Sequence, residues 1–153
     1  MTGGAVLHLF HPALVHFSVA LLVCGAVAEG LGIATSRERL ERTGAAAVVA
    51  GTLSLLPTIA AGYLAANSVS VPDAARALLE RHERLGLAVL AVFSASQLLK
   101  AWWGGRPAGA PRVIYAALLA IGLLLVVWVA FLGGDLVYSN GIGVERPAGV
   151  RSA

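Results

Sequence analysis

The sequence is poor in charged residues and has almost no cysteine. Only 12% of its 153 residues are Asp, Glu, Lys or Arg, about half the share found in ordinary soluble domains. In contrast, 58% of the residues are hydrophobic, and the mean hydropathy is +0.83. A single cysteine, Cys24, excludes an intrachain disulfide, a CxxC redox pair and a CxxCH haem attachment. These properties predict an integral membrane protein.

Several functional signatures are also absent. No Lys or Arg precedes the first apolar run, so we expect that run to be a retained helix and not a cleaved signal peptide. The sequence contains no P-loop, no HExxH motif and no recognisable nucleophile–base triad. The net charge of +3 comes from basic residues scattered through short loops. They indicate membrane topology rather than a nucleic-acid partner, and nothing favours an enzyme.

The fold class that we predict is all-α: an integral membrane four-helix bundle in contact with the lipid bilayer. Four apolar stretches have the roughly 20 residues needed to cross a bilayer: 12–34, 43–66, 85–103 and 113–132. Pro12 fits the opening turn of the first. An amphipathic lead-in over residues 72–84 precedes the third. After the fourth comes a Gly-rich segment, 133–144, and then a flexible tail, 145–153, the whole chain forming one membrane domain.

Within the Gly-rich segment, Gly133 and Gly134 are expected to end the fourth helix, and Asn140 and Gly141 to form a turn. An even number of spans places both termini on the same side. The first and third loops carry six basic residues and the opposite side carries five. With an uncharged N-terminus, this predicts extracytoplasmic termini in a bacterial cytoplasmic membrane. Tyr115 and other aromatic residues near the span ends are expected to form an interfacial belt.

The four histidines gather at one end of the predicted bundle. His8, His11 and His16 stand at the start of the first span, and His82 stands at the start of the third. Asp135, Tyr138 and Asn140 follow the fourth span and therefore belong to the same end. Odd spans begin, and even spans end, on one face of the membrane. This convergence holds for either orientation of the protein.

Polar groups inside membranes tend to be functional and to need partners. His16 and His82 lie on apolar helical stripes, so we expect both to point into the bundle. His11 is a candidate N-cap, where the positive end of a helix favours neutral imidazole, the form that binds a metal or haem iron. Glu29, near the opposite end of the first span, is expected to pair with a basic residue there.

Three stretches resemble a known family. They are "FHPALVHFSVALL" at the start of the first span, "RHERLG" before the third and "GGDLVYSNGIGV" after the fourth. In order and spacing they are similar to the bacterial membrane proteins grouped as domain of unknown function 2231. The resemblance implies a four-helix membrane domain, sometimes fused to or encoded beside Rieske iron–sulfur or cytochrome modules, and hence respiratory electron transfer.

By motif position, the resemblance carries over five residues: His11, His16, His82, Gly134 and Tyr138. Two positions depart from the family pattern. Ser18 stands where such sequences usually have proline, and Asn140 stands where many have histidine.

Three hypotheses follow. In the leading one the protein is a small b-type cytochrome or respiratory electron-transfer subunit, with His16 and His82 as axial ligands of haem b on two helices. His11 or Tyr138 would then hydrogen-bond a propionate or a ligating ring. In the second, the protein is a cofactor-free structural or assembly subunit whose histidines bond across helices. In the third, it handles a divalent metal or protons through His11, His16, His82 and Asp135.

Overall fold

The computed structural model describes the backbone of residues 4–144 and the side chains from Phe10 onward. Four helices fill this part of the chain, which contains no strand: α1 (Gly4–Thr35), α2 (Glu38–Ser68), α3 (Asp73–Trp102) and α4 (Ala110–Tyr138). All four are long and apolar enough to cross a membrane. The predicted all-α class with four spanning helices is confirmed.

The helices are longer than the predicted spans. α1 begins at Gly4, so Pro12 and His11 lie inside it, and the expectations of an opening-turn proline and an N-cap histidine are wrong. α4 continues through Gly133 and Gly134 to Tyr138, so these glycines do not end the helix. Membrane helices tolerate glycine because their backbone groups remain bonded within the helix. The tail expected at 145–153 lies outside the described residues.

The turn predicted at Asn140 and Gly141 is present, although the helix before it ends later than expected. Asn140 follows the helix and donates its side-chain N–H to the carbonyl of Asp135, at 3.0 Å. Gly141 has a φ of 64°, in the left-handed region that glycine adopts without strain. The first half of the Gly-rich segment, residues 133–138, is therefore helix, and the turn lies in its second half.

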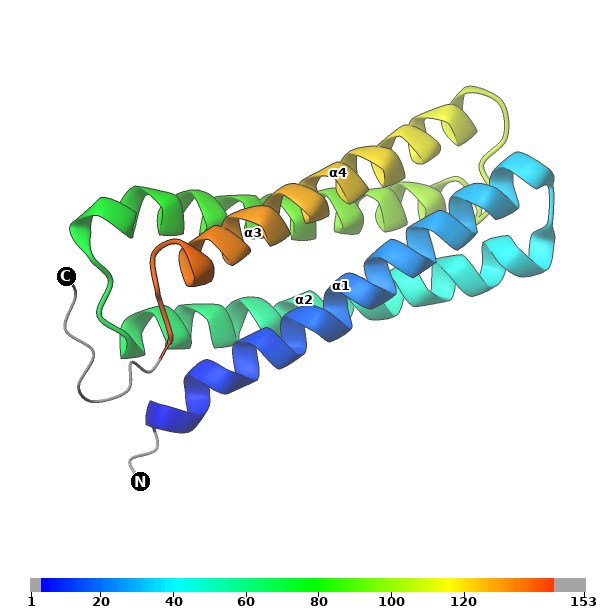
Figure 1. Ribbon diagram of the computed structural model, residues 1–153. Helices are drawn as coiled ribbons and strands as arrows, with labels where there is room; N and C mark the ends of the chain where they lie inside the picture. Colours follow the sequence, from blue (N-terminus) through cyan, green and yellow to red (C-terminus); the bar gives the residue numbers. More distant parts are fainter. Residues whose placement is uncertain (1–3, 145–153) are drawn as a thin grey trace.

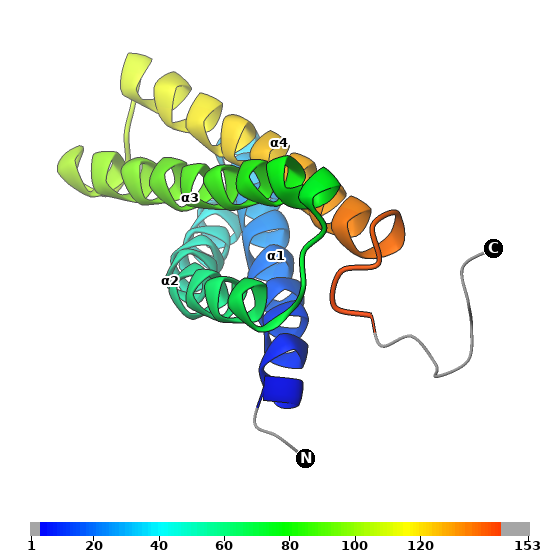
Figure 2. The ribbon, with the colours of Figure 1, turned by 90° about the vertical axis from the view of Figure 1, so that its left-hand side faces the viewer.

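The four helices form two hairpins, α1–α2 and α3–α4, that lie against each other (Figures 1 and 2). Packing is closest within α1–α2, where glycines let the two backbones meet. A Cβ atom at Gly25 would lie 2.8 Å from the backbone nitrogen of Val48, and one at Gly44 would overlap the backbone of Glu29. These glycines fix the distance between the first two helices.

The buried core lies between the hairpins and contains residues from all four helices. Leu22, Val48, Phe93 and Tyr115 are each 0% exposed and come from α1, α2, α3 and α4 in turn. Large apolar side chains on the outer faces are open, among them Leu98 and Phe131, which are more than 70% exposed. Such extensive apolar exposure is what a lipid-facing surface requires. The protein is a multi-pass membrane protein in contact with the bilayer.

Three hydroxyl groups link α1 to α2 in the middle of the first hairpin. Ser18, which is fully buried, lies 2.8 Å from the hydroxyls of both Thr58 and Ser54. Thr58 and Ser54 also donate to carbonyls of their own helix. Ser18 therefore supplies an interhelical hydrogen bond.

We expect Ser18→Ala to lower the free energy of unfolding by about 1 kcal/mol, because interhelical hydrogen bonds in membrane proteins contribute roughly 0.6–1.7 kcal/mol. Unfolding by SDS titration in mixed micelles measures this loss. Thr43→Ala is the control, since this exposed hydroxyl bonds only to its own helix, and it should change stability by less than about 0.5 kcal/mol. Equal effects of the two substitutions would contradict the role of Ser18.

Candidate functional site

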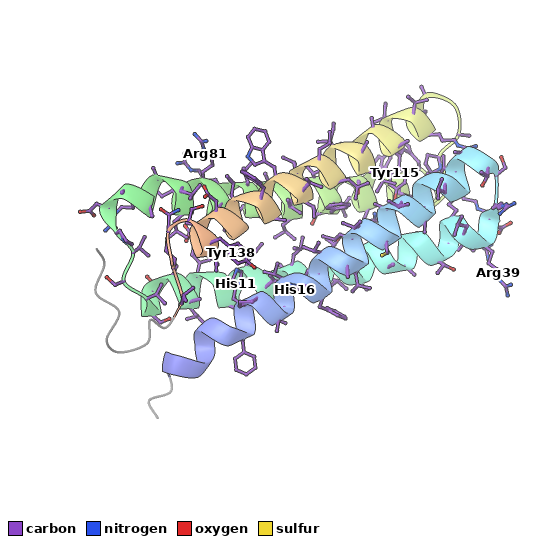
Figure 3. The ribbon with its side chains drawn as sticks, in the orientation of Figure 1. His11, His16, Arg39, Arg81, Tyr115 and Tyr138 are labelled. Atoms are coloured by element: carbon purple, nitrogen blue, oxygen red, sulfur yellow. The ribbon has the colours of Figure 1, made fainter. Side chains whose placement is uncertain are left out.

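His11 and His16 lie toward the end of the bundle where α1 and α3 begin and where α2 and α4 end (Figure 3), and His82 lies in the first third of α3 at the same end. His11 is half-buried on α1 and faces α2. Its Nδ1–H donates to the carbonyl of Thr58, at 3.0 Å. Its ring lies over Gly62, where an added Cβ atom would be 3.0 Å from the ring. Glycine at that position thus provides the space that the imidazole occupies.

The second hairpin contains the same arrangement. His82 on α3 is half-buried, and its Nδ1–H donates to the carbonyl of Val129 on α4, at 3.1 Å. Its ring lies over Gly133, where an added Cβ atom would be 3.1 Å away. This contact explains why glycine stands inside α4.

The hydrogen bonds decide which ring nitrogen is available. A neutral imidazole that donates through Nδ1 carries its lone pair on Nε2. Within the described residues, neither His11 nor His82 forms a hydrogen bond through Nε2. A ring nitrogen donating to a main-chain carbonyl is the usual support for a metal-ligating histidine, because it fixes the tautomer and ring orientation and raises ligand basicity. Both rings are therefore suited to act as ligands through Nε2.

His16 occupies a different position from the one expected. Its side chain is exposed, and its Nδ1–H donates to the carbonyl of Pro12 on the same helix, at 2.6 Å. The expectation that it points into the bundle is wrong. The inward face of α1 runs through Ser18, Leu22 and Glu29. His11 fits that spacing of about seven residues per two turns, whereas His16 lies off it.

The remaining predicted site residues are not gathered around the two imidazoles. Tyr138 is 90% exposed, and Figure 3 shows it near the end of α4. Asp135 is half-buried and accepts from Asn140 through its backbone carbonyl. In the part of the chain that the structure describes, no three His, Cys, Asp or Glu side chains are grouped to hold a metal ion. The divalent-metal hypothesis therefore has no assembled site, and His8 has no described side chain.

A family profile described as "Predicted membrane protein (DUF2231)" matches residues 7–146, which include α2, α3, α4 and all but the first three residues of α1. The chain belongs to this family. No curated protein and no solved structure matches the chain. The resemblance carried by the three motifs is thus confirmed, and the family description specifies membrane location without an activity.

At the opposite end, this DUF2231 protein contains a buried ionic cluster. Glu29 is 0% exposed and forms an ion pair with Lys100. This agrees with the expectation that Glu29 pairs with a basic residue at this end. The hydroxyl of Tyr115 donates to Glu29 Oε1 at 2.7 Å. Lys100 lies 3.8 Å from Glu41 and 5.1 Å from the centre of the Tyr115 ring. α1, α2, α3 and α4 thus each contribute one member.

The expectation that Tyr115 belongs to an interfacial aromatic belt is wrong, because its side chain is fully buried. The sequence does not indicate that this tyrosine is buried, since tyrosine near the end of a span is common at membrane interfaces. Cavities of about 310 Å³ and 260 Å³ border Glu41 at this end. The charges that line them are already engaged, Arg106 with Glu38 and Lys100 with Glu41 and Glu29. The cluster joins all four helices, and the histidine pair is the better candidate site.

Proposed function

We propose that the protein binds haem b within the membrane through His11 and His82 and serves as a small electron-transfer subunit. One observation carries the proposal: two half-buried imidazoles from different hairpins each donate Nδ1–H to a carbonyl and keep Nε2 unbonded within the described residues. Bis-histidine ligation from two helices is a common way for a bundle to hold haem. His82 keeps its predicted role, and His11 replaces the exposed His16.

The haem would supply reversible one-electron chemistry. The chain's own residues would orient the axial ligands and set the redox potential of the haem. The carbonyls of Thr58 and Val129 hold the two rings in one tautomer and make Nε2 a stronger donor. Gly62 and Gly133 leave room for the rings on the neighbouring helices. Apolar surroundings lower the local dielectric and so tune the potential. A Rieske or cytochrome module in the bacterial cytoplasmic membrane is the partner that fits this role.

An absorbance spectrum tests the proposal. The protein purified in mild detergent from a haem-sufficient host should show a Soret band and, after dithionite, a sharp α-band at about one haem per chain. His11→Ala and His82→Ala should each abolish the bands. His16→Ala is the matched control and should keep them, because His16 is exposed and bonds only to its own helix. A featureless spectrum from folded wild-type protein would overturn the proposal, as would loss of haem in the His16 variant alone.

A second candidate is a cofactor-free structural or assembly subunit. The observation that favours it is that each histidine bond joins two helices, α1 to α2 and α3 to α4. In that case His11→Asn, which keeps a hydrogen-bond donor of similar reach, should restore most of the stability lost in His11→Ala. The same substitution cannot restore haem, because an amide is not an axial ligand. Stability and spectrum together separate the two candidates.

A further inference from the structure

The contacts of the first hairpin recur in the second with the same spacing. The histidine–carbonyl bonds join residues 47 positions apart in both hairpins, His11 with Thr58 and His82 with Val129. The glycine beneath each ring lies four residues beyond the carbonyl, at Gly62 and Gly133. Each member of the second set therefore lies 71 residues after its counterpart in the first.

The same interval relates contacts in the core. Gly51 lies under Leu22, whose side chain would be 2.9 Å from a Cβ atom at that glycine. Gly122 lies under Phe93, which would be 2.8 Å from a Cβ atom there. Phe93 follows Leu22, and Gly122 follows Gly51, by 71 residues. Two independent interhelical contacts at different depths thus repeat at one offset.

The helix arrangement agrees with a twofold relation. α1 and α3 begin at one end of the bundle and α2 and α4 end there, so the two hairpins point in the same direction (Figure 1), and Figure 2 shows that they cross at an angle. α1 contacts α4 about as extensively as α2 contacts α3, as exchange of the two hairpins requires. The main departure is the closer packing of α1–α2. Gly44 lets the α1 and α2 backbones meet, but its counterpart in the second hairpin is the bulky Tyr115. The larger side chain keeps α3 and α4 further apart at this position.

Equivalent residues also touch each other. Lys100 is the counterpart of Glu29, 71 residues later, and the two form the buried ion pair. Two equivalent positions can contact each other only where they lie near the axis that relates them. Opposite charges make this contact favourable, whereas identical acidic residues would repel in a low-dielectric interior. At the other end, the equivalent imidazoles of His11 and His82 form equivalent bonds, each within its own hairpin.

We propose that the bundle consists of two copies of one helical hairpin, related by a pseudo-twofold axis along its length, with the inner face of each copy built to bind the other. The Glu29–Lys100 pair marks the axis at one end, and the two histidines flank it at the other. Any ligand held between His11 and His82 would meet two equivalent side chains. The duplication does not depend on haem binding, so it can hold or fail independently of the proposed function.

Exchanging equivalent core residues tests the proposal. Leu22→Phe adds volume against Gly51, and Phe93→Leu leaves a gap above Gly122, so each single variant should unfold more readily. The double variant L22F/F93L should return to within about tenfold of the parent's unfolding constant, because total volume and the twofold environment are kept. SDS titration in mixed micelles gives the constants.

The matched control exchanges Phe93 with Val48, which is equally buried but is not its counterpart. The unfolding constant of V48F/F93V should remain more than about a hundredfold above that of the parent. The added volume at residue 48 and the cavity at residue 93 lie in environments that the twofold axis does not relate. Equal recovery of the two double variants, or recovery of neither, would overturn the proposal.

A permuted chain gives a second and independent measurement. In it the α3–α4 hairpin precedes α1–α2, and the residues 69–72 that join α2 to α3 instead join α4 to α1. Twofold equivalence predicts that the same short link spans both gaps, so the permuted protein should keep its helicity by circular dichroism and elute as the parent does in detergent. An unfolded or aggregated permuted chain would contradict the equivalence of the two hairpins.

Discussion

Gly44→Val is expected to lower the free energy of unfolding by roughly 3 kcal/mol or more, because it places a branched side chain where the α1 backbone already lies. A Cβ atom at Gly44 would overlap the backbone nitrogen and Cα of Glu29. A flexible side chain could move aside, but a helix backbone can yield only if the hairpin opens. Opening would also disturb the ion pair of Glu29 with Lys100. SDS titration of the purified protein measures the loss.

Gly30→Val is the matched control for this substitution. Gly30 lies next to Glu29 on the same helix, and no atom lies within 4 Å of a Cβ placed there. It should change stability by less than about 1 kcal/mol, within the range set by helix propensity alone. If valine is tolerated equally at both positions, the α1–α2 backbones do not approach as closely as described.

The four-helix architecture followed from hydropathy and length, since a bilayer demands apolar stretches of about 20 residues. The helix ends did not follow, because hydropathy reports the apolar core of a span and not where the helix ends. Charged residues such as Glu38 and Asp73 lie inside helices that extend beyond the apolar stretch. Gly133 suggested a helix end, but its role is to accommodate the ring of His82 on another helix. Such a contact is invisible in a single sequence.

The convergence of histidines at one end was predictable from topology alone. Which of them points inward was not, because three histidines within nine residues cover several faces of a helix. Periodicity measured from His16 gave an apolar stripe, but in a membrane helix apolar residues face the lipid as well as the core. The small polar residue Ser18 and the acid Glu29 were better guides to the inward face, and their spacing includes His11.

The ionic cluster and the histidine pair lie at opposite ends of the bundle. At the charged end, polar groups from all four helices contact one another and join the two hairpins. At the histidine end, each imidazole bonds within its own hairpin. Side-chain ion pairs therefore join the two hairpins at the charged end, whereas the histidine bonds at the other end lie within each hairpin.

Lys100→Met should destabilise the protein by about 3–5 kcal/mol, the usual loss when one partner of a buried ion pair is removed. Glu29 is 0% exposed, so its carboxylate would keep only the hydroxyl of Tyr115 as a donor. One of its oxygens, Oε2, already has no hydrogen-bond partner within the described residues. Thermal or SDS unfolding in detergent provides the measurement.

The double variant Glu29→Met/Lys100→Met separates the contribution of the pair from the cost of a stranded charge. Apolar residues of similar volume often replace a buried ion pair with little loss, so we expect it to recover most of the stability lost in Lys100→Met. Recovery would mean that the pair favours the correct docking of the two hairpins and adds little to the free energy of unfolding. This is expected where equivalent positions of the two hairpins carry opposite charges. A double variant as unstable as Lys100→Met would instead show that the ion pair itself supplies stability, through its contacts with Tyr115 and Glu41.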